Sequence, residues 1–335
     1  MVRRKLIDKG QFINLKDRSI LMRYYFAPME GLTDSIYRSI HHKYFSGIHS
    51  YYMPFISPTQ HRCLTHREAR ELPMAASVPF RAVPQILTRI PEDFLWAAEQ
   101  CVERGYDEVN LNVGCPSGTV VAKGKGSGML ADVDALDRFL DAVYSGATLP
   151  VSVKTRVGVT EPEEFPRILE VYNRYPIKEL TIHPRVRKQF YKGSVDMEAF
   201  RYAVQNSKNP LCYNGDLRTR GEIDALSGEF PEIEAVMIGR GLIGNPGMLS
   251  FNMNAQTLEA FHNELFEAYI ENFGGSRNAM FRMKENWHQM ILMFEDSEKL
   301  WKKLRKTTDV TEYRSIVAQI FHTLQMAPEL GSMED

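Results

Sequence analysis

Short runs of β-branched and apolar residues alternate with longer segments of helical periodicity from residue 22 onward. This alternation is typical of a parallel α/β architecture. The pattern predicts strands at 23–29, 47–53, 82–87, 108–113, 150–156, 179–183, 210–214 and 235–239. Helices are expected at 33–44, 91–105, 132–145, 162–174, 196–205 and 219–226. Eight β/α units favour a (β/α)8 TIM barrel over a doubly wound sheet, because their span is close to the roughly 250 residues typical of such barrels.

The pattern changes near residue 255, where the strand signals stop. Apolar residues then recur at intervals of three and four, which predicts a small all-helical C-terminal domain. The sequence FGGSR at 273–277 indicates a turn between two of its helices. We therefore expect three parts: an N-terminal extension at 1–21, to which no role is assigned, a catalytic barrel at 22–252 and a helical domain at 253–335.

Composition and charge exclude several classes of protein. The chain of 335 residues is 44% hydrophobic and 25% charged, and no window is apolar over the roughly 18 to 20 residues that a membrane helix needs. The N-terminus lacks the apolar segment of a secretory signal. The 4 cysteines form no CxxC pair, which favours a reducing, cytoplasmic location. His61, Cys63 and His66 lack a nearby fourth ligand, so we expect no metal site.

The segment NLNVGCPSGTVVAKGKGSGML at 110–130 combines many glycines with one cysteine. It does not match a phosphate-binding P-loop, and its G-x-G-x-x-A match lies too far beyond the strand to be a dinucleotide fingerprint. Cys115 instead follows the strand at 108–113, at the end of the barrel where such enzymes hold reactive groups. Gly114 and Pro116 flank it and allow a ligand to approach closely. A thiol in this place can act as nucleophile or as proton donor.

Polar or conformationally special residues occupy the carboxyl ends of the other predicted strands. They are Ala27-Pro28-Met29, Gln85, Asn112, Lys154, Arg156, His183, Arg185, Asn214-Gly215-Asp216 and Gly239-Arg240-Gly241. The glycine-rich loops after the last two strands lie where barrels commonly bind phosphate, which predicts a phosphorylated cofactor. The amides of Gln85 and Asn112 and the cation of Lys154 suit a flat heterocycle that becomes anionic on reduction, as an isoalloxazine does.

These residues lie in motifs that resemble those of the tRNA-dihydrouridine synthases, FMN-dependent enzymes of bacterial type. The motifs are APMEGLTD (27–34), VPQI (83–86), NLNVGCPSGTV (110–120), SVKTRVG (152–158), TIHPRVRKQFYKG (181–193), YNGD (213–216) and MIGRG (237–241), and RMKENWHQM (282–290) resembles the family's C-terminal domain more loosely. The resemblance implies reduction of the 5,6 double bond of particular uridines in tRNA, with NADPH re-reducing the FMN.

The resemblance also implies roles for individual residues. FMN would be held by Pro28, Met29, Gln85, Asn112, Lys154, His183, Asn214, Gly215, Asp216, Gly239 and Arg240, with Asn112 between flavin and uracil. Hydride would pass from flavin N5 to uracil C6, while the catalytic Cys115 protonates C5 from the opposite face. A thiol with an ordinary pKa of about 8.5 is mostly protonated at neutral pH, as this role requires. Lys123 and the glycines at 124, 126 and 128 would form a mobile loop presenting Cys115.

The expected macromolecular partner is tRNA, although the formal net charge of the chain is only -1. The target base must be extruded into the barrel mouth, so we expect backbone contacts elsewhere. Residues 277–306 hold eight Lys or Arg against four acidic residues, a local excess suited to phosphate contact. The candidate substrate-binding residues are Asn112, Arg156, Arg185, Arg187, Lys188, Arg282 and Lys284. No feature of the sequence demands a second copy, so a monomer is expected.

Two other functions stay open at this point. An FMN barrel enzyme acting on a free small molecule would not need the basic helical domain. A flavin-retaining protein that only binds tRNA would not need Cys115, Lys154 and His183 together. Thr88 and Pro184 depart from the family pattern, because glycine is common at both positions. The sequence does not indicate which uridine is reduced or whether NADPH or NADH is preferred.

Overall fold

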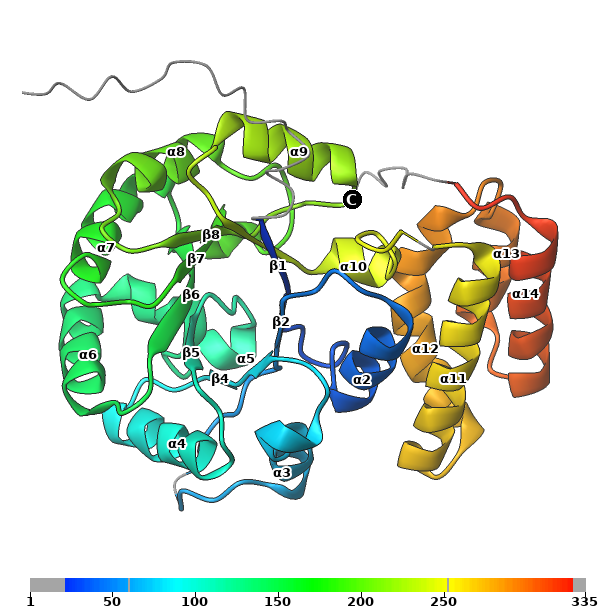
Figure 1. The fold of residues 1–335 in the computed structure, drawn as a ribbon, viewed down its shortest axis with the longest axis horizontal. Coiled ribbons are helices and arrows are strands. Elements are labelled where there is room, and N and C mark those ends of the chain that lie inside the picture. The colour runs from blue at the N-terminus through cyan, green and yellow to red at the C-terminus, as the bar shows by residue number, and fades with distance from the viewer. Residues whose placement is uncertain (1–21, 60, 252, 328–335) are drawn as a thin grey trace, which may run out of the picture.

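A computed structural model describes residues 22–59, 61–251 and 253–327 (Figure 1). The predicted extension at 1–21 lies outside these residues. Within them, parallel strands form one sheet in the order β3-β2-β1-β9-β8-β7-β6-β5-β4. The strands are β1 (Arg23–Phe26), β2 (Ser50–Tyr52), β3 (Ala82–Val83), β4 (Gln85–Ile86), β5 (Val109–Val113), β6 (Val151–Gly158), β7 (Leu180–Val186), β8 (Leu211–Tyr213) and β9 (Ala235–Ile238).

The two ends of the sheet meet at Pro84. The strands β3 and β4 stand at opposite ends of the sheet order, yet only Pro84 separates them in the chain. Proline has no N–H to donate to a ladder, and the strand predicted at 82–87 is divided at this residue. A parallel bridge between Ile56 and Ile86 lies beside the division. With β3 and β4 counted as one interrupted strand, the predicted (β/α)8 barrel is confirmed.

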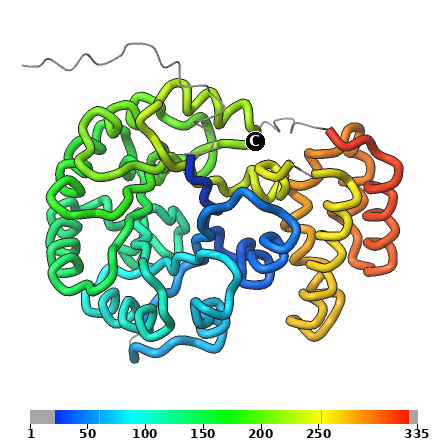
Figure 2. Tube along the Cα trace, viewed as in Figure 1, coloured from blue at the N-terminus to red at the C-terminus, as the bar shows by residue number. Residues whose placement is uncertain are grey.

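Helices surround the barrel and then form a separate group on one side of it (Figures 1 and 2). The barrel helices are α2 (Ser35–Tyr44), α3 (His66–Glu71), α4 (Pro91–Glu103), α5 (Gly118–Val121), α6 (Val133–Gly146), α7 (Phe165–Tyr172), α8 (Met197–Asn206), α9 (Arg220–Glu229) and α10 (Arg240–Gly244). The group at the side consists of α11 (Ala255–Phe273), α12 (Ser276–Met290), α13 (Glu298–Lys306) and α14 (Val310–Thr323). The predicted helical C-terminal region is therefore present.

Helix boundaries follow from local capping and differ from the predicted ones in a few places. The carboxylate of Asp132 accepts the backbone N–H of Ala135 and caps α6. Helix α3 was not predicted, although Thr65 and Glu68 form a capping box at its start. The glycine-rich loop expected after β9 is instead the short helix α10, which begins at Arg240.

The turn predicted between two C-terminal helices is confirmed. Helix α11 ends at Gly274, whose φ of 66° lies in the left-handed region that glycine adopts without a Cβ clash. Helix α12 begins two residues later, at Ser276. No helix among the described residues is long and apolar enough to cross a membrane.

Side chains of β5 alternate between the outer side of the barrel, which faces the helices, and the barrel interior. Its sequence VNLNV alternates, and Val109, Leu111 and Val113 belong to the hydrophobic core between sheet and helices. Because successive side chains of a strand point to opposite faces, Asn110 and Asn112 point into the barrel.

The barrel interior is polar along β4 to β7 and apolar along the other strands. The inward positions of β6 and β7 repeat the alternation of β5 and carry Ser152, Lys154, Arg156, Thr181, His183 and Arg185. The opposite half is lined by a separate small cluster of Tyr25, Ala27, Tyr52, Val83, Cys212, Ala235 and Met237. Polar residues inside a barrel need hydrogen-bond partners or a ligand, so this interior is where function is to be sought.

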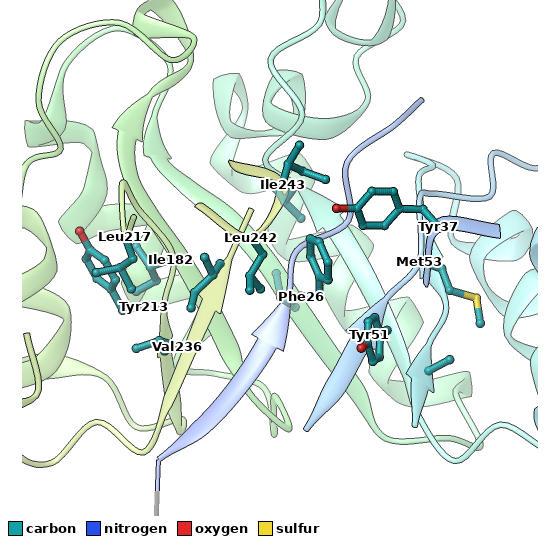
Figure 3. Close-up of a cluster of buried hydrophobic side chains, with 14 of the residues drawn as sticks. Phe26, Tyr37, Tyr51, Met53, Ile182, Tyr213, Leu217, Val236, Leu242 and Ile243 are labelled. Atoms are coloured by element: carbon teal, nitrogen blue, oxygen red, sulfur yellow. The ribbon is translucent and has the colours of Figure 1, made fainter. Parts of the chain in front are cut away.

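Aromatic side chains join the helical group to the barrel. Figure 3 shows Phe26 of β1, Tyr37 of α2 and Tyr51 of β2 in the main core, where the ring of Phe26 lies 5.8 Å from that of Tyr37. Phe261 of α11 packs edge-on against Tyr37 at 5.7 Å. The Tyr269 hydroxyl donates to the carboxylate of Asp34, the N-cap of α2, at 3.2 Å. These contacts fix α11 against the barrel.

A buried carboxyl at the amino-terminal end of the barrel makes stability depend on pH. Burial raises the pKa of Glu179 to about 7, and Arg23 and the Tyr25 hydroxyl offset only part of this rise; Glu108 adds to it and Lys178 opposes it. The folded-state pKa lies above the ordinary value, so the stabilising contribution is present below pH 4.5 and is lost as pH rises through about 7.

We expect Glu179→Gln to remove this dependence. Between pH 5 and pH 8, the wild type should lose about 1 to 3 kcal/mol of unfolding free energy that the variant keeps. Urea denaturation at the two pH values measures the difference. Equal changes in both proteins would contradict the assignment.

Candidate active site

A cavity of about 590 Å³ opens at the carboxyl ends of the barrel strands. All the residues that the sequence proposes for cofactor binding line it: Pro28, Met29, Gln85, Asn112, Lys154, His183, Asn214, Gly215, Asp216, Gly239 and Arg240. Cys115 and Arg156 line it as well. The structure therefore brings these side chains together, as expected for strand ends on one rim.

Hydrogen bonds from two sides hold the backbone around Cys115. The side-chain oxygen of Asn112 accepts the N–H groups of Gly114 at 3.0 Å and Cys115 at 2.9 Å. The Arg156 guanidinium donates to the carbonyl oxygen of Gly114 at 3.0 Å. The Cys115 carbonyl in turn accepts the Ser127 hydroxyl at 2.8 Å. The thiol is thus carried on a fixed turn at the end of β5.

The segment after Cys115, for which the sequence predicts a mobile loop, contains short helical elements on either side of Lys123 and Gly124. It folds into α5 and a 3-10 turn over Gly126–Ala131, which packs back on Cys115. Gly126 has a φ of 57°, and a Cβ there would lie only 2.8 Å from the Cys115 carbonyl oxygen. This glycine allows close packing behind the cysteine, because any side chain would push the turn away.

The electrostatic surroundings of Cys115 favour a protonated thiol. Burial raises its pKa above the ordinary value, and the hydrogen bond from the Ser117 backbone and the charges of Arg156 and Lys154 oppose this rise without cancelling it. A half-buried thiol that keeps its proton at neutral pH is suited to act as an acid.

Lys154 is an unpaired cation that lines the cavity. It points inward from β6 opposite Asn112 of β5 in the sheet register. Burial, and next the charge of Arg156, lower its pKa to about 8. Within the described residues its ammonium group has no hydrogen-bond or ion-pair partner. An ammonium surrounded by protein without a counter-ion is costly, so its position favours a ligand that carries or develops negative charge.

His183 is held in its neutral form beside a set of cations. Burial, followed by the charges of Arg156, Lys154, Arg185 and Arg240, lowers its pKa well below the ordinary value. Arg185 lies 3.1 Å from His183 Nε2 and can only donate, so Nε2 accepts. The proton of the imidazole is then on Nδ1, which is free to donate to a ligand.

Asp216 balances two of the arginines at the rim. Its carboxylate pairs with Arg185 and with Arg240, the latter at 2.8 Å. Burial alone would raise the pKa of Asp216, but the hydrogen bond and charge of Arg185 and then those of Arg240 hold it below the ordinary value. The paired carboxylate therefore stays ionised and fixes both guanidinium groups.

The loop after β8 and the start of α10 approach each other closely. A Cβ at Gly241 would lie 2.1 Å from the Leu217 carbonyl oxygen, so glycine is required there. A Cβ at Gly215 would lie 2.9 Å from the Tyr213 hydroxyl oxygen. The glycines thus bring the two loops that bear Asp216 and Arg240 together at the cavity.

Two aromatic residues at the cavity mouth were not among the predicted site residues. Phe190 and Tyr191 are 49% and 51% exposed although both are large and line the cavity. Two guanidinium groups lie near the Tyr191 ring, that of Arg156 at 5.3 Å and that of Arg240 at 5.4 Å from its centroid. Phe190 has a φ of 53°, a rare conformation for a residue with a side chain. The adjacent aromatics in KQFYKG were the available sequence signal.

The predicted substrate-binding cations occupy different kinds of places. Arg156 and Arg185 are buried, and Arg156 also donates to the carbonyl oxygens of Val186 and Phe190. Arg187 and Lys188 form a 3-10 turn after β7 and do not line the cavity.

The two cations predicted on α12 are occupied in contacts within the protein. Arg282 is 4.0 Å from the Asp34 carboxylate and lies over the ring of Tyr269, where it helps to join α11 and α12 to the barrel. Lys284 donates to the carbonyl oxygens of Arg305 and Thr307. Both lie away from the cavity lining.

A second depression adjoins the cavity on the side of the helical group. It shares Met29, Glu30, Leu32 and Arg240 with the cavity, and its other lining residues are Ile243, Lys284, Glu285, His288, Gln289, Trp301 and Arg305. Helix α13, which contributes Trp301 and Arg305 to this depression, carries five exposed cations: Lys299, Lys302, Lys303, Arg305 and Lys306. No group of three or more His, Cys, Asp or Glu side chains in the described residues is arranged to hold a metal ion.

Alkylation with iodoacetamide tests the surroundings of Cys115. We expect its rate to rise with pH about a midpoint above the pKa of about 8.5 of a free thiol. Lys154→Met should slow the reaction at pH 8 by about two- to threefold, because a cation that favours the thiolate is removed. Peptide mass spectrometry separates Cys115 from the exposed Cys63, which serves as internal reference. Identical pH profiles for the two cysteines would contradict the assigned burial effect.

Comparison with known proteins places the chain in a family. The family model of dihydrouridine synthase (Dus) matches residues 25–331. tRNA-dihydrouridine synthase B of Pasteurella multocida (strain Pm70) is 30% identical over 227 residues, 67% of this chain and 67% of the relative. A probable tRNA-dihydrouridine synthase of Staphylococcus aureus (strain COL) is 33% identical over 237 residues, 67% of this chain and 69% of the relative. Morphinone reductase, a solved structure, is 15% identical with a TM-score of 0.48 over 68% of this chain and 84% of its own. By the family model and these relatives, the chain belongs to the dihydrouridine synthase family.

Proposed function

We propose that this protein reduces the C5–C6 double bond of specific uridines in tRNA, with FMN as cofactor and NADPH as reductant. Family membership supports the reaction class. The observation that carries the proposal is that one cavity holds a thiol kept protonated by burial, Cys115, and an unpaired cation, Lys154. Reduction of an activated double bond needs a proton donor and a site that tolerates developing negative charge, and these two groups supply both.

The residues of the cavity fit a flavin mononucleotide. The amide groups of Gln85 and Asn112, the ammonium of Lys154 and the Nδ1–H of His183 would bind the polar edge of the ring system. Asp216 fixes Arg240 beside Gly215 and Gly239, which with Asn214 would hold the phosphate. Pro28 and Met29 would contact the apolar part of the ring. When bound and reduced, the flavin supplies a hydride.

The chain itself supplies the proton and the geometry. Cys115 Sγ would give its proton to C5 as a hydride adds to C6. The hydride's own electron pair forms the C6–H bond, and the former π pair forms the C5–H bond with the proton. The sulfur is left as a thiolate, which solvent reprotonates. The hydrogen bonds from Asn112 and Arg156 to the turn around Cys115 keep the sulfur at a fixed place during this step.

Lys154 would stabilise the negative charge that accompanies reduction. Its pKa of about 8 leaves the ammonium mostly charged at neutral pH but makes that charge sensitive to mild alkali. NADPH would reach the same mouth, since the chain has no separate dinucleotide fingerprint. Phe190 and Tyr191, exposed at that mouth, offer stacking surfaces for a planar base.

The exposed cations near the second depression would bind the phosphates of tRNA. Lys299, Lys302, Lys303 and Lys306 are exposed on α13, the helix whose Trp301 and Arg305 line that depression. Arg187 and Lys188 would extend this surface on the other side. Arg156, Arg185, Arg282 and Lys284 would contribute by holding the site and the helices in place as well as by any substrate contact. We expect the protein to act as a monomer in the cytoplasm.

The first test is mapping of dihydrouridine by mass spectrometry. Unmodified tRNA is incubated with the purified protein, FMN and NADPH. We expect dihydrouridine at defined positions, formed about a hundredfold more slowly by Cys115→Ala because a general acid is lost. Cys115→Ser is the matched control, since it keeps the size of the side chain but not its acidity. A reducible flavin without any product would contradict the proposed substrate and favour a small-molecule reductase or a tRNA-binding role.

A charge reversal on α13 tests the tRNA surface. We expect Lys302→Glu/Lys306→Glu to raise the KM for tRNA by about tenfold at low salt and to weaken its salt dependence, because phosphate contacts are lost. Flavin binding should not change. Lys208→Glu, at an exposed position between α8 and β8, is the control with a single reversed charge. Equal effects of the two variants would show that net charge and not this surface matters.

A further inference from the structure

A continuous line of hydrogen bonds runs through the barrel interior from the Cys115 turn to Glu108. The side-chain amide of Asn112 donates to Gln85 Oε1 at 2.7 Å, and that of Gln85 donates to Asn110 Oδ1 at 2.8 Å. Asn110 donates to the Ser152 hydroxyl at 2.9 Å, and this hydroxyl donates to Glu108 Oε1 at 2.6 Å. All of these side chains are more than 90% buried.

Strand register produces this line. Asn110 and Asn112 are successive inward positions of β5, and Glu108 is the inward position before them. Gln85 of β4 pairs with Asn110 in the sheet register, and Ser152 of β6 pairs with Asn110 on the other side. The side chains therefore interleave across three adjacent strands from one end of the barrel to the other.

The far end of the line can only accept hydrogen bonds. The Glu108 carboxylate pairs through Oε2 with Arg81 at 2.8 Å and with Lys178 at 2.6 Å, and Oε1 is the atom that accepts from Ser152. These two cations are about one-third exposed, whereas the carboxylate is 3% exposed. A carboxylate has no proton to give, so the Ser152 hydrogen points toward it.

The direction of the hydrogen bond to Glu108 determines which atom donates and which accepts at each following residue of the line. Ser152 donates to Glu108 and therefore receives the N–H of Asn110, which turns the Asn110 oxygen toward Gln85. The Gln85 nitrogen then faces Asn110, and its oxygen faces Asn112. At the rim the Asn112 oxygen meets the fixed backbone donors of Gly114 and Cys115. The hydrogen bonds of the line and of the rim are all made in this one sense, and the Ser152 hydroxyl has the Val109 carbonyl oxygen only as a longer alternative acceptor at 3.5 Å.

We propose that Glu108 is a positioning residue for the active site, acting through Ser152 and Asn110 to fix the orientation of the Gln85 and Asn112 amides. Each of these two nitrogens uses one hydrogen in the line and has no second acceptor in the described part of the chain. The second hydrogens are available to the cavity that both residues line. The barrel floor thus makes this wall of the cavity a pair of N–H donors, which selects a ligand with acceptor atoms at that edge.

The inference rests on the proposed function only in that the ligand at this wall is the flavin. The line itself is a property of the protein without cofactor. It is tested with Ser152→Ala and Glu108→Gln, which interrupt it at two places, and with their combination. Glu179→Gln is the matched control, since Glu179 is a second buried carboxylate at the same end of the barrel and bonds to Tyr25 and not to the line.

The first measurement is NMR of side-chain amide protons in the full-length, cofactor-free protein with isotope-labelled asparagine and glutamine. We expect solvent exchange at Asn110, Gln85 and Asn112 to accelerate by about tenfold in both variants, because the line has lost an end that orders it. Glu179→Gln should leave these signals unchanged. Unaltered Gln85 and Asn112 amides in Ser152→Ala would overturn the proposal.

The second measurement is FMN titration followed by visible absorption. We expect each single variant to bind FMN about tenfold more weakly and to shift the spectrum of the bound flavin, and the double variant to lose no more than one single variant. Multiplied losses in the double variant, or the same loss in Glu179→Gln, would overturn the proposal. Absence of FMN binding by the wild type would count against the proposed cofactor. The NMR measurement of the side-chain amides would still test whether Glu108 and Ser152 orient Gln85 and Asn112.

Thermal unfolding separates positioning from loss of fold. Ser152→Ala leaves Glu108 with its two ion pairs and so carries the test if Glu108→Gln does not fold. A spectral shift in a variant with the wild-type Tm supports positioning. Weakened FMN binding that follows only the drop in Tm, without a change in the spectrum or in amide exchange, would overturn it.

Discussion

The inward alternation of β5 to β7 is the constraint on which the rest of the site depends. A closed barrel gives each strand one face toward the helices and one toward an interior with little water. The Val and Leu residues of VNLNV point outward and belong to the core. Because side chains alternate along a strand, the two asparagines must then point into the barrel. Polar side chains confined in this way must bond to one another or to a ligand. Some of these side chains form hydrogen bonds with polar side chains of the neighbouring strands, and others line the cavity where a ligand can bind them.

The same constraint explains how the backbone turn that carries the thiol is held. Asn112 is held from below by Gln85 and accepts the backbone N–H groups of the Cys115 turn above. Gly126 lets the following segment close behind the turn, and Arg156 ties it to the end of β7. A fixed sulfur costs nothing to orient at the moment of reaction, whereas a mobile loop would have to be ordered each time.

The spacing of apolar residues and the residues typical of turns predicted the barrel and most of the cavity lining. This was possible because the carboxyl ends of the strands in a parallel barrel share one rim. Cys115, Lys154 and His183 were found this way. Other features depend on contacts between distant parts of the chain and have no local signal. The sequence of Gly239–Gly244 suggests a loop, yet packing against Leu217 permits a short helix. Phe190 and Tyr191 look like ordinary apolar residues until the fold leaves them exposed at the mouth.

The cations show why residue type alone gives so little information about role. Arg156, Arg185 and Arg282 are predicted to contact substrate, and in the structure their guanidinium groups also contact, respectively, carbonyl oxygens, Asp216 and the carboxylate of Asp34. A buried guanidinium with five donors is most useful where several acceptors must be held together. The exposed lysines on α13 have no such partners in the described part of the chain, so under the proposed function their charge would be available for phosphate. The division therefore follows from burial: the buried arginines hold the site together, and in the proposed function the exposed lysines would provide long-range attraction for a polyanion.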